Sequence, residues 1–260
     1  MKRKIFIFLM VGFVVSLYAL TTWAQTEEQE DQFLYVNEYA VKPSMVKEFE
    51  AARKEEAALC TQHKYPYSWM TYSLNDFHYI CVWPLENYAD ITSWDKAAGE
   101  LADKVGKEQW QALWKRMYSS YEYRHDSTYY LVPELSYTPE NPRLKSEEGN
   151  FFFWDIYYIH TEKGTEFAEI IKKFMSLCKS KKITEGLNTL YGDIGTNQPV
   201  FAFSSRAKDA ADFYTHNNKM WEMLGKEGEM LYEKMLPFIR KNEVKQGWLR
   251  PDLSYKPEEK

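Results

Sequence analysis

The segment PELSYTPE at residues 133–140 occurs a second time as PDLSYKPE at residues 251–258, an offset of 118 positions. The same offset carries Phe33 to Phe151, at the other end of each copy. Chance does not keep one register over that distance, so the chain contains an internal repeat. We therefore expect a first repeat at residues 33–140, a linker at 141–150 and a second repeat at 151–260.

Each repeat has the pattern strand, helix, strand, strand, helix, strand. The expected first strands are 33–41 and 151–159, the first helices 44–62 and 162–181, the hairpin strands 67–74, 76–83, 187–191 and 200–204, and the long helical stretches 87–121 and 207–240. Gly106 and Gly225 predict a break in each long helical stretch. This order is that of a ferredoxin-like βαββαβ unit, in which both helices cover one face of an antiparallel sheet. Two such sheets can close into one barrel and remove their edges.

On this order and repeat, the chain resembles the dimeric α+β barrel superfamily, which includes antibiotic-biosynthesis monooxygenase-like, EthD-like and NIPSNAP-like domains. The resemblance covers nearly all of the sequence from residue 33 onward. It implies an α+β fold in which two tandem ferredoxin-like repeats form a dimeric α+β barrel within one chain.

A narrower resemblance points to the haem-degrading monooxygenases of that superfamily. It rests on Asn37 in the first strand and Trp94 in the second helix of the first repeat. Those proteins carry a haem-ligating His ten residues beyond the Trp, where this sequence has Lys104. A protonated lysine has no free lone pair for iron, so ligation in the family manner is not supported.

Polar residues recur on one face of the two first strands. Alternation places Asn37 and Tyr39 on one face, and Asp155 and Tyr157 on the matching face of the second repeat. If this face lines the barrel, these residues are polar groups inside an aromatic cavity, which is typical of a small-ligand site. We therefore expect any small-molecule site inside the barrel. The alternative is that each polar group bonds backbone or a nearby Tyr in a packed core.

Two helix positions complete the set of candidate ligand-binding residues. With a one-residue shift, Trp94 matches Phe213 and Ala97 matches His216. His216 is a candidate base, ligand or substrate contact, although a solvent-facing or structural His is the alternative. No catalytic residue is predicted. No CxxC, HExxH or Cys/His pair at zinc spacing occurs, so no metal is predicted either.

The N-terminus has the order of a signal peptide. Lys2-Arg3-Lys4 is followed by an apolar run to Leu20 and by the small-residue site Thr22-Trp23-Ala24. We expect cleavage after Ala24, a flexible lead-in at residues 25–32, and an exported protein, periplasmic or secreted. An uncleaved membrane anchor is the alternative, but the apolar run is shorter than about twenty residues, so no stable membrane insertion is expected after cleavage.

Composition narrows the function without identifying it. The net charge of −5 comes without a long basic stripe, so nucleic acid is not an expected partner. The three cysteines leave at least one thiol free. The leading hypothesis is a small-molecule-binding or non-catalytic barrel with a hydrophobic or aromatic ligand. The alternatives are a monooxygenase-like enzyme acting on such a molecule, and a protein-interaction module. No cofactor is the leading expectation, with haem as the alternative.

Overall fold

A computed structural model describes residues 31–258 of the chain. The predicted signal peptide at residues 1–24 lies outside the described residues, as does the lead-in except for its last two positions. The export prediction therefore stays a prediction.

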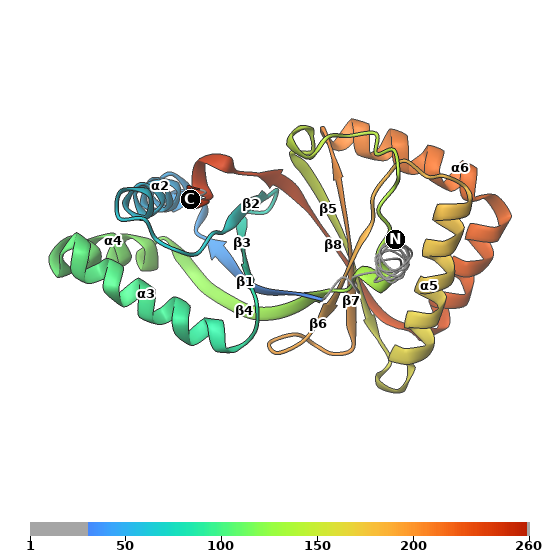
Figure 1. The fold of residues 1–260 in the computed structure, drawn as a ribbon, viewed down its shortest axis with the longest axis horizontal. Coiled ribbons are helices and arrows are strands. Elements are labelled where there is room, and N and C mark those ends of the chain that lie inside the picture. Colours follow the sequence, from blue (N-terminus) through green and yellow to red (C-terminus); the bar gives the residue numbers. More distant parts are fainter. Residues whose placement is uncertain (1–30, 259–260) are drawn as a thin grey trace, which may run out of the picture. The chain divides into compact units, whose positions relative to one another are not determined.

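Eight antiparallel strands close into one barrel in the order β1-β3-β2-β8-β5-β7-β6-β4 (Figure 1). The strands are β1 (Gln32–Val41), β2 (Met70–Leu74), β3 (His78–Leu85), β4 (Tyr121–Leu131), β5 (Phe151–Ile159), β6 (Asn188–Gly192), β7 (Val200–Ala207) and β8 (Ile239–Leu249). We call β1 to β4 with their helices the first half, and β5 to β8 with theirs the second half. The edges pair across the halves, β2 with β8 and β4 with β6. The predicted α+β class and closed barrel are confirmed, and the strand order is consistent with two fused ferredoxin-like units.

Helices cover the outside of each half (Figure 1). The first half carries α2 (Val46–Gln62), α3 (Ala89–Val105) and α4 (Lys107–Ser119), and the second half carries α5 (Gly164–Ser180) and α6 (Ala210–Met235). The predicted breaks are confirmed. Gly106 separates α3 from α4 at φ 98°, and Gly225 interrupts α6 at φ 55°. Both angles lie in the left-handed region, which glycine adopts without a steric penalty.

The two faces of each strand belong to different cores. Leu34 and Val36 of β1 pack with Phe152 and Trp154 of β5 inside the barrel, so side chains from both halves fill it. The alternate residues of β1, such as Tyr39, pack outward against α2 and the other helices of the first half. The layer between sheet and helices is therefore a second core, and each half has its own.

The repeated Leu-Ser-Tyr motif crosses from one half to the other. It begins in two 3-10 turns, η2 (Pro133–Leu135) and η6 (Pro251–Leu253), each placed directly after the last strand of its own half. Leu253 nevertheless packs in the helix layer of the first half, and Leu135 in that of the second. Figure 1 shows the segment that follows β8, drawn in red, beside α2 accordingly.

The hydrogen bonds of the two crossings match. Tyr255 donates to the carbonyl of Tyr65, and Tyr137 donates to the carbonyl of Ile183, both at 2.7 Å. The hydroxyl of Thr71 donates to the carbonyl of Leu253, and Thr189 does the same to Leu135. The most recognisable sequence motif is therefore the segment that joins the halves.

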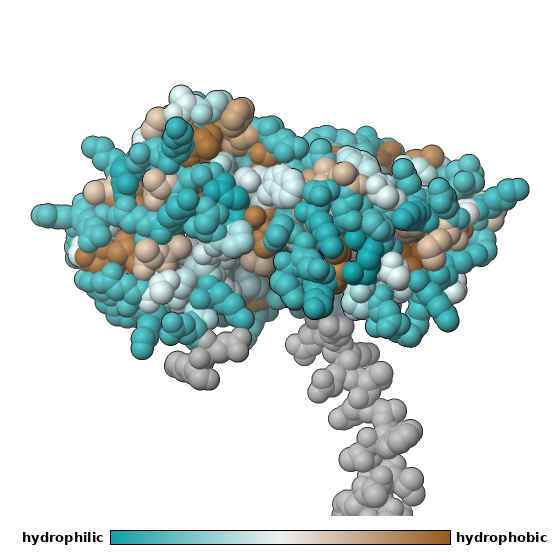
Figure 2. All heavy atoms as spheres, turned by 90° about the horizontal axis from the view of Figure 1, so that it is seen from above, coloured by the Kyte–Doolittle hydropathy of each residue, from teal (hydrophilic) through white to brown (hydrophobic). Residues whose placement is uncertain are grey.

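Hydrophilic side chains cover most of the face shown in Figure 2, with small apolar patches between them. Within the described part of the chain, none of the helices combines the length and apolar character that crossing a bilayer requires.

Candidate ligand cavities

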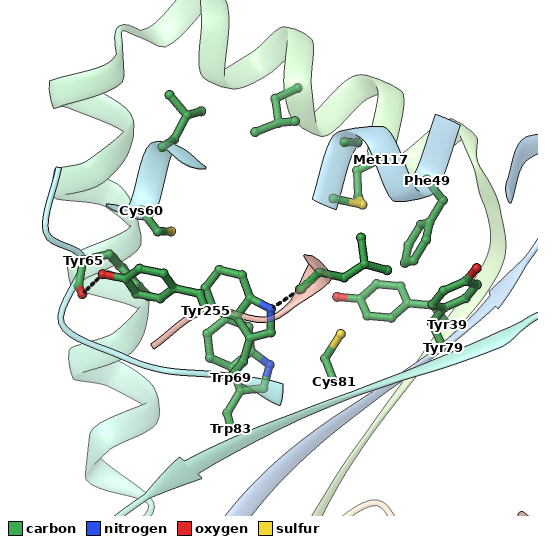
Figure 3. Packing of buried hydrophobic residues seen from close by; sticks show 14 of the residues in the cluster. Tyr39, Phe49, Cys60, Tyr65, Trp69, Tyr79, Cys81, Trp83, Met117 and Tyr255 are labelled. Carbon is green, nitrogen blue, oxygen red and sulfur yellow. Dashed lines mark hydrogen bonds between the residues drawn. The ribbon is translucent and has the colours of Figure 1, made fainter. Parts of the chain in front are cut away.

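The first-half cavity lies between the sheet and the helices and measures about 470 Å³. Figure 3 shows part of its surroundings, with Trp69 and Trp83 on the sheet side and Cys60 on the helix side. Tryptophan rings follow one another along its wall: the centroids of Trp69 and Trp83 are 4.8 Å apart, and those of Trp83 and Trp94 are 5.0 Å apart. A wall of aromatic faces suits a planar organic molecule.

Asn37 lines this cavity as part of a hydrogen-bonded network. Its side-chain oxygen accepts from Trp83 Nε1 at 2.8 Å, and its nitrogen donates to Asp126 Oδ1 at 2.8 Å. Asp126 in turn forms an ion pair with Arg124 at 2.7 Å. Asn37 is 1% exposed, and these hydrogen bonds offset the cost of burying its polar side chain. Through them, Asn37 orients Trp83 and Asp126.

A buried guanidinium, from Arg53 of α2, also lines the cavity. Arg53 is 1% exposed and pairs with Glu56 one turn along the same helix, while its other terminal nitrogen contacts the Cys81 thiol. The guanidinium lies 5.3 Å from the ring centre of Tyr39 and 5.6 Å from that of Trp69. Burial alone would lower the pKa of Arg53, but Cys81, Glu56 and Tyr39 outweigh it and the pKa rises, so the side chain stays charged.

Two N–H donors of this cavity lack partners. The Nε of Arg53 and the Nε1 of Trp94 are buried and have no hydrogen-bond partner among the described residues. Both side chains line the cavity. A buried donor left unpaired costs about 1–3 kcal/mol, and such groups are uncommon in folded proteins. Both point to an acceptor that the protein itself does not supply.

The second-half cavity holds the other predicted strand residues and measures about 200 Å³. Asp155 and Tyr157 line it, and the phenol of Tyr157 donates to Asp155 Oδ2 at 2.5 Å. The second carboxylate oxygen accepts from Asn242 Nδ2 at 2.6 Å. Burial, and then the Asp155 charge, raise the pKa of Tyr157, so the phenol stays protonated and remains a donor.

His216 does not line either of these cavities but lies next to the second. Its Nδ1 is 2.9 Å from the backbone oxygen of Asp212 and 3.2 Å from the carboxylate of the same residue. It borders a narrow crevice of about 30 Å³ that shares Phe213 and Met220 with the second-half cavity. The structure therefore brings together Asn37, Tyr39 and Trp94 in one cavity, and Asp155 and Tyr157 in another, with His216 in the crevice beside the latter.

The expectation that the Asn37 and Asp155 faces line the inside of the barrel is wrong. The face of β1 that carries Asn37 and Tyr39 points to the helices, and the opposite face, with Leu34 and Val36, fills the barrel. The same holds for Asp155, whose cavity is closed by residues of α5 and α6 such as Phe174 and Trp221. Both faces of each first strand are apolar, so alternation separates the faces without showing which one points inward.

Sequence reasoning missed Arg53, Asp126 and Asn242. Arg53 had a usable signal, because it follows Phe49 by four residues and precedes Cys60 by seven, which places it on the buried stripe of α2. A charged residue on such a stripe requires a buried partner. Asp126 and Asn242 gave no comparable signal, since their roles depend on strand pairing with β1 and β5.

The haem-ligating His of the family that the sequence resembles has no counterpart in either cavity, although two methionines, Met220 and Met235, line the second. The first-half lining offers no His, and burial raises the pKa of its Cys60 thiol, which keeps that sulfur protonated. The second-half lining also lacks His, and its Tyr157 phenol is held protonated. Lys104, at the position of the family's His, is exposed on α3 and is not among the lining residues. We therefore assign no role to haem.

Metal and disulfide chemistry receive no support from the residue geometry. Between residues 31 and 258, no group of three or more His, Cys, Asp or Glu is placed to hold a metal ion. Cys60, Cys81 and Cys178 are all buried free thiols, which answers the question that their odd number left open.

Solved structures of other proteins share this architecture. No protein-family model matches the chain, and no curated protein does. One similar solved structure is a proposed monooxygenase from Lactobacillus acidophilus NCFM, at TM-score 0.53 and 9% identity over 87% of this chain and 97% of that one. An anthrone oxidase-like protein aligns at TM-score 0.59 and 7% identity, over 86% and 93%. A chlorite dismutase from Candidatus Nitrospira defluvii, in complex with imidazole, aligns at 0.52 and 10%, over 88% and 96%.

At these identities the likeness concerns the fold alone. The chain has the fold of the dimeric α+β barrels, shared with monooxygenase-like and chlorite dismutase-like proteins.

Proposed function

We propose that the first-half cavity binds a small aromatic molecule that carries an oxygen acceptor. The observation that carries this proposal is the pair of buried, unpartnered donors, Arg53 Nε and Trp94 Nε1. A ligand oxygen near either donor recovers the free energy that its burial costs. The cavity volume of about 470 Å³ falls within the usual range of small-molecule sites.

The unpartnered Nε of the charged Arg53 favours an anionic or strongly polarised oxygen beside it, although Glu56 and Asp95 also line the cavity. Arg53 stays protonated, and its partner Glu56 occupies one terminal nitrogen, so Nε remains available. Hydrogen bonds between a cationic donor and an oxyanion are about twice as strong as neutral ones. Carboxylates, phenolates and enolates on an aromatic body are therefore the expected ligands.

Calorimetric titration with 2-naphthoate tests the proposal. Replacement of Trp94 by Phe keeps an aromatic ring and removes only the N–H, and it gives the residue that the second half carries at the matched position, Phe213. We expect Trp94→Phe to weaken 2-naphthoate binding about tenfold. Trp221→Phe, which alters the wall of the other cavity, serves as the matched control and should leave the affinity unchanged. Equal affinities for wild type and Trp94→Phe would reject the proposal.

A second candidate function is oxidation of the bound molecule. It is supported by the fold shared with the proposed monooxygenase and the anthrone oxidase-like protein, and by the positive charge of Arg53. A nearby cation lowers the pKa of a phenol or an enolisable ketone, and the resulting electron-rich anion is the form that reacts with dioxygen. For anthrone, the methylene carbon would lose two hydrogens and gain one oxygen, so that anthrone and O₂ give anthraquinone and water.

An oxygen electrode measures this activity directly. We expect one O₂ consumed per anthraquinone formed, and slower turnover in Trp94→Phe. Consumption no faster than in buffer would remove the oxidase candidate without affecting the binding proposal. A haem titration belongs to the same series: a Soret shift that saturates at one equivalent would show that a residue other than His ligates haem in this protein.

A further inference from the structure

We infer that the second-half cavity binds a small organic cation, an ammonium group attached to an apolar body. This site and its ligand class are separate from the first-half cavity, so the inference does not rest on the function proposed above.

The first argument is a carboxylate with neutral partners. Asp155 accepts from the phenol of Tyr157 and from the side-chain amide of Asn242, and neither group carries a positive charge. An ionised carboxylate has about four acceptor positions, so two remain for a donor that enters the cavity. A cationic donor would also supply the missing charge.

Aromatic rings around that carboxylate provide the second argument. Phe153 and Phe213 stack with centroids 4.2 Å apart, Tyr214 meets Phe213 edge to face at 5.2 Å, and Trp221 meets Tyr232 at 5.8 Å. All five side chains line the cavity. Ring faces attract cations through their quadrupole, and a group of them is a known solution for ammonium recognition. The cavity volume of about 200 Å³ suits a small molecule.

A third argument comes from the matched positions of the first half. Arg53 and Glu56 correspond at the offset of 118 to Ile171 and Phe174, so the second-half cavity has no buried guanidinium to repel a cation. Phe174 lines the cavity directly. Asn37 corresponds to Asp155, which exchanges a neutral amide for a carboxylate.

Calorimetric titration with 2-phenylethylamine, 2-phenylethanol and phenylacetate tests the inference, because the three probes share one aromatic body and differ in charge. We expect the amine to bind at one equivalent, the alcohol to bind at least about tenfold more weakly, and the acid not to bind. Asp155→Asn keeps the shape and removes the charge, and it should bring the amine down to the affinity of the alcohol. Glu222→Gln removes an exposed carboxylate from the same helix as Trp221 and should change nothing.

A second variant tests the aromatic wall at a more exposed position than the half-buried Asp155. Tyr214 is 48% exposed at the cavity wall, so Tyr214→Ala should lower the melting temperature only slightly, through its contacts with Phe213 and Gln246, and weaken the amine several-fold through the lost ring face. Trp94→Phe, in the other half, should leave amine binding unchanged. Equal binding of all three probes, no effect of Asp155→Asn, or no amine binding at millimolar concentration would each overturn the inference.

Discussion

The two helix layers share their backbone plan and differ in the chemistry at matched positions. In the first half, the cross-strand pairs of Asn37 are Cys81 and Asp126, and its side chain bonds to Asp126 and to Trp83. In the second half, Asp155 lies between Phe203 and Val244 in its cross-strand pairs, so neither neighbour there carries a charge. One repeated scaffold therefore holds two different polar environments, one with a buried cation and one with a carboxylate.

This difference shows that one set of residues maintains the shared backbone and another set determines the polar character of each cavity. The Leu-Ser-Tyr crossings, with their matched hydrogen bonds, are the same in both halves and maintain the shared scaffold. The cavity walls carry the differences. Equivalent variants at the two crossings should therefore have equivalent effects. Equivalent variants at the two cavity walls should have different effects.

The largest effect is expected from the crossings. Leu253 is 0% exposed and Leu135 is 6% exposed, so Leu253→Ala and Leu135→Ala should each lower the free energy of unfolding by about 2–5 kcal/mol, measured by urea denaturation. The change should appear in the opposite half. Hydrogen exchange should accelerate in α2 for Leu253→Ala and in α5 for Leu135→Ala. Faster exchange confined to the half that carries the substitution would contradict the crossing.

A smaller and opposite pair of effects is expected from two tryptophans of the first half. Trp83 Nε1 donates to Asn37, so Trp83→Phe should lower the free energy of unfolding by about 1–3 kcal/mol through an unpaired acceptor. Trp94 Nε1 has no partner to lose, so Trp94→Phe should cost much less or stabilise the protein. Thermal and urea unfolding of both variants measure the difference. Equal losses would mean that the Trp94 N–H is satisfied in solution without a ligand.

The smallest effect is expected from an ion pair that only the second half has. Arg143 donates to both carboxylate oxygens of Asp212, at 2.9 and 3.0 Å, whereas the matched position in the first half is Ser93. Burial raises the pKa of Asp212, but the Lys208 backbone N–H and Arg143 outweigh it, and the net pKa lies below its usual range.

The sign of the pH dependence follows from that direction. A lowered carboxyl pKa contributes stability above about pH 4, the unfolded value, and loses it as the pH falls through the folded pKa. Arg143→Gln should therefore cost about 1 kcal/mol at pH 7 and progressively less as the pH falls below about 4, measured by urea denaturation across this range. A cost independent of pH would show that Arg143 acts through packing alone.

Sequence reasoning reached the fold because the fold is encoded in local and repeated signals. The 118-residue offset, the aromatic first strands and the glycines at 106 and 225 each have a direct structural counterpart. It grouped Asn37 with Tyr39, and Asp155 with Tyr157, because alternation along one strand is a local property. It failed on the direction of that face, which depends on how the whole sheet curves and which side the helices cover.

The polar partners depended on contacts that a single sequence does not display. Asp126 meets Asn37 through strand pairing 89 positions away, and Asn242 meets Asp155 at a separation of 87. His216 looked like a site residue by type, yet its neighbours give it a local bond to its own helix. The fully buried Arg53 was the one omission with a readable sequence signal.

Carrying both sheets on one chain has a consequence for how such a protein can change. In an assembly of two identical subunits, every substitution appears in both sites at once, so the two sites remain copies. Here each half always meets the same, covalently attached counterpart, and the crossings keep the pair docked at high effective concentration. The residues at positions 37 and 155 can therefore change independently, as Asn37 and Asp155 illustrate. One barrel can then hold two sites with opposite charge preference.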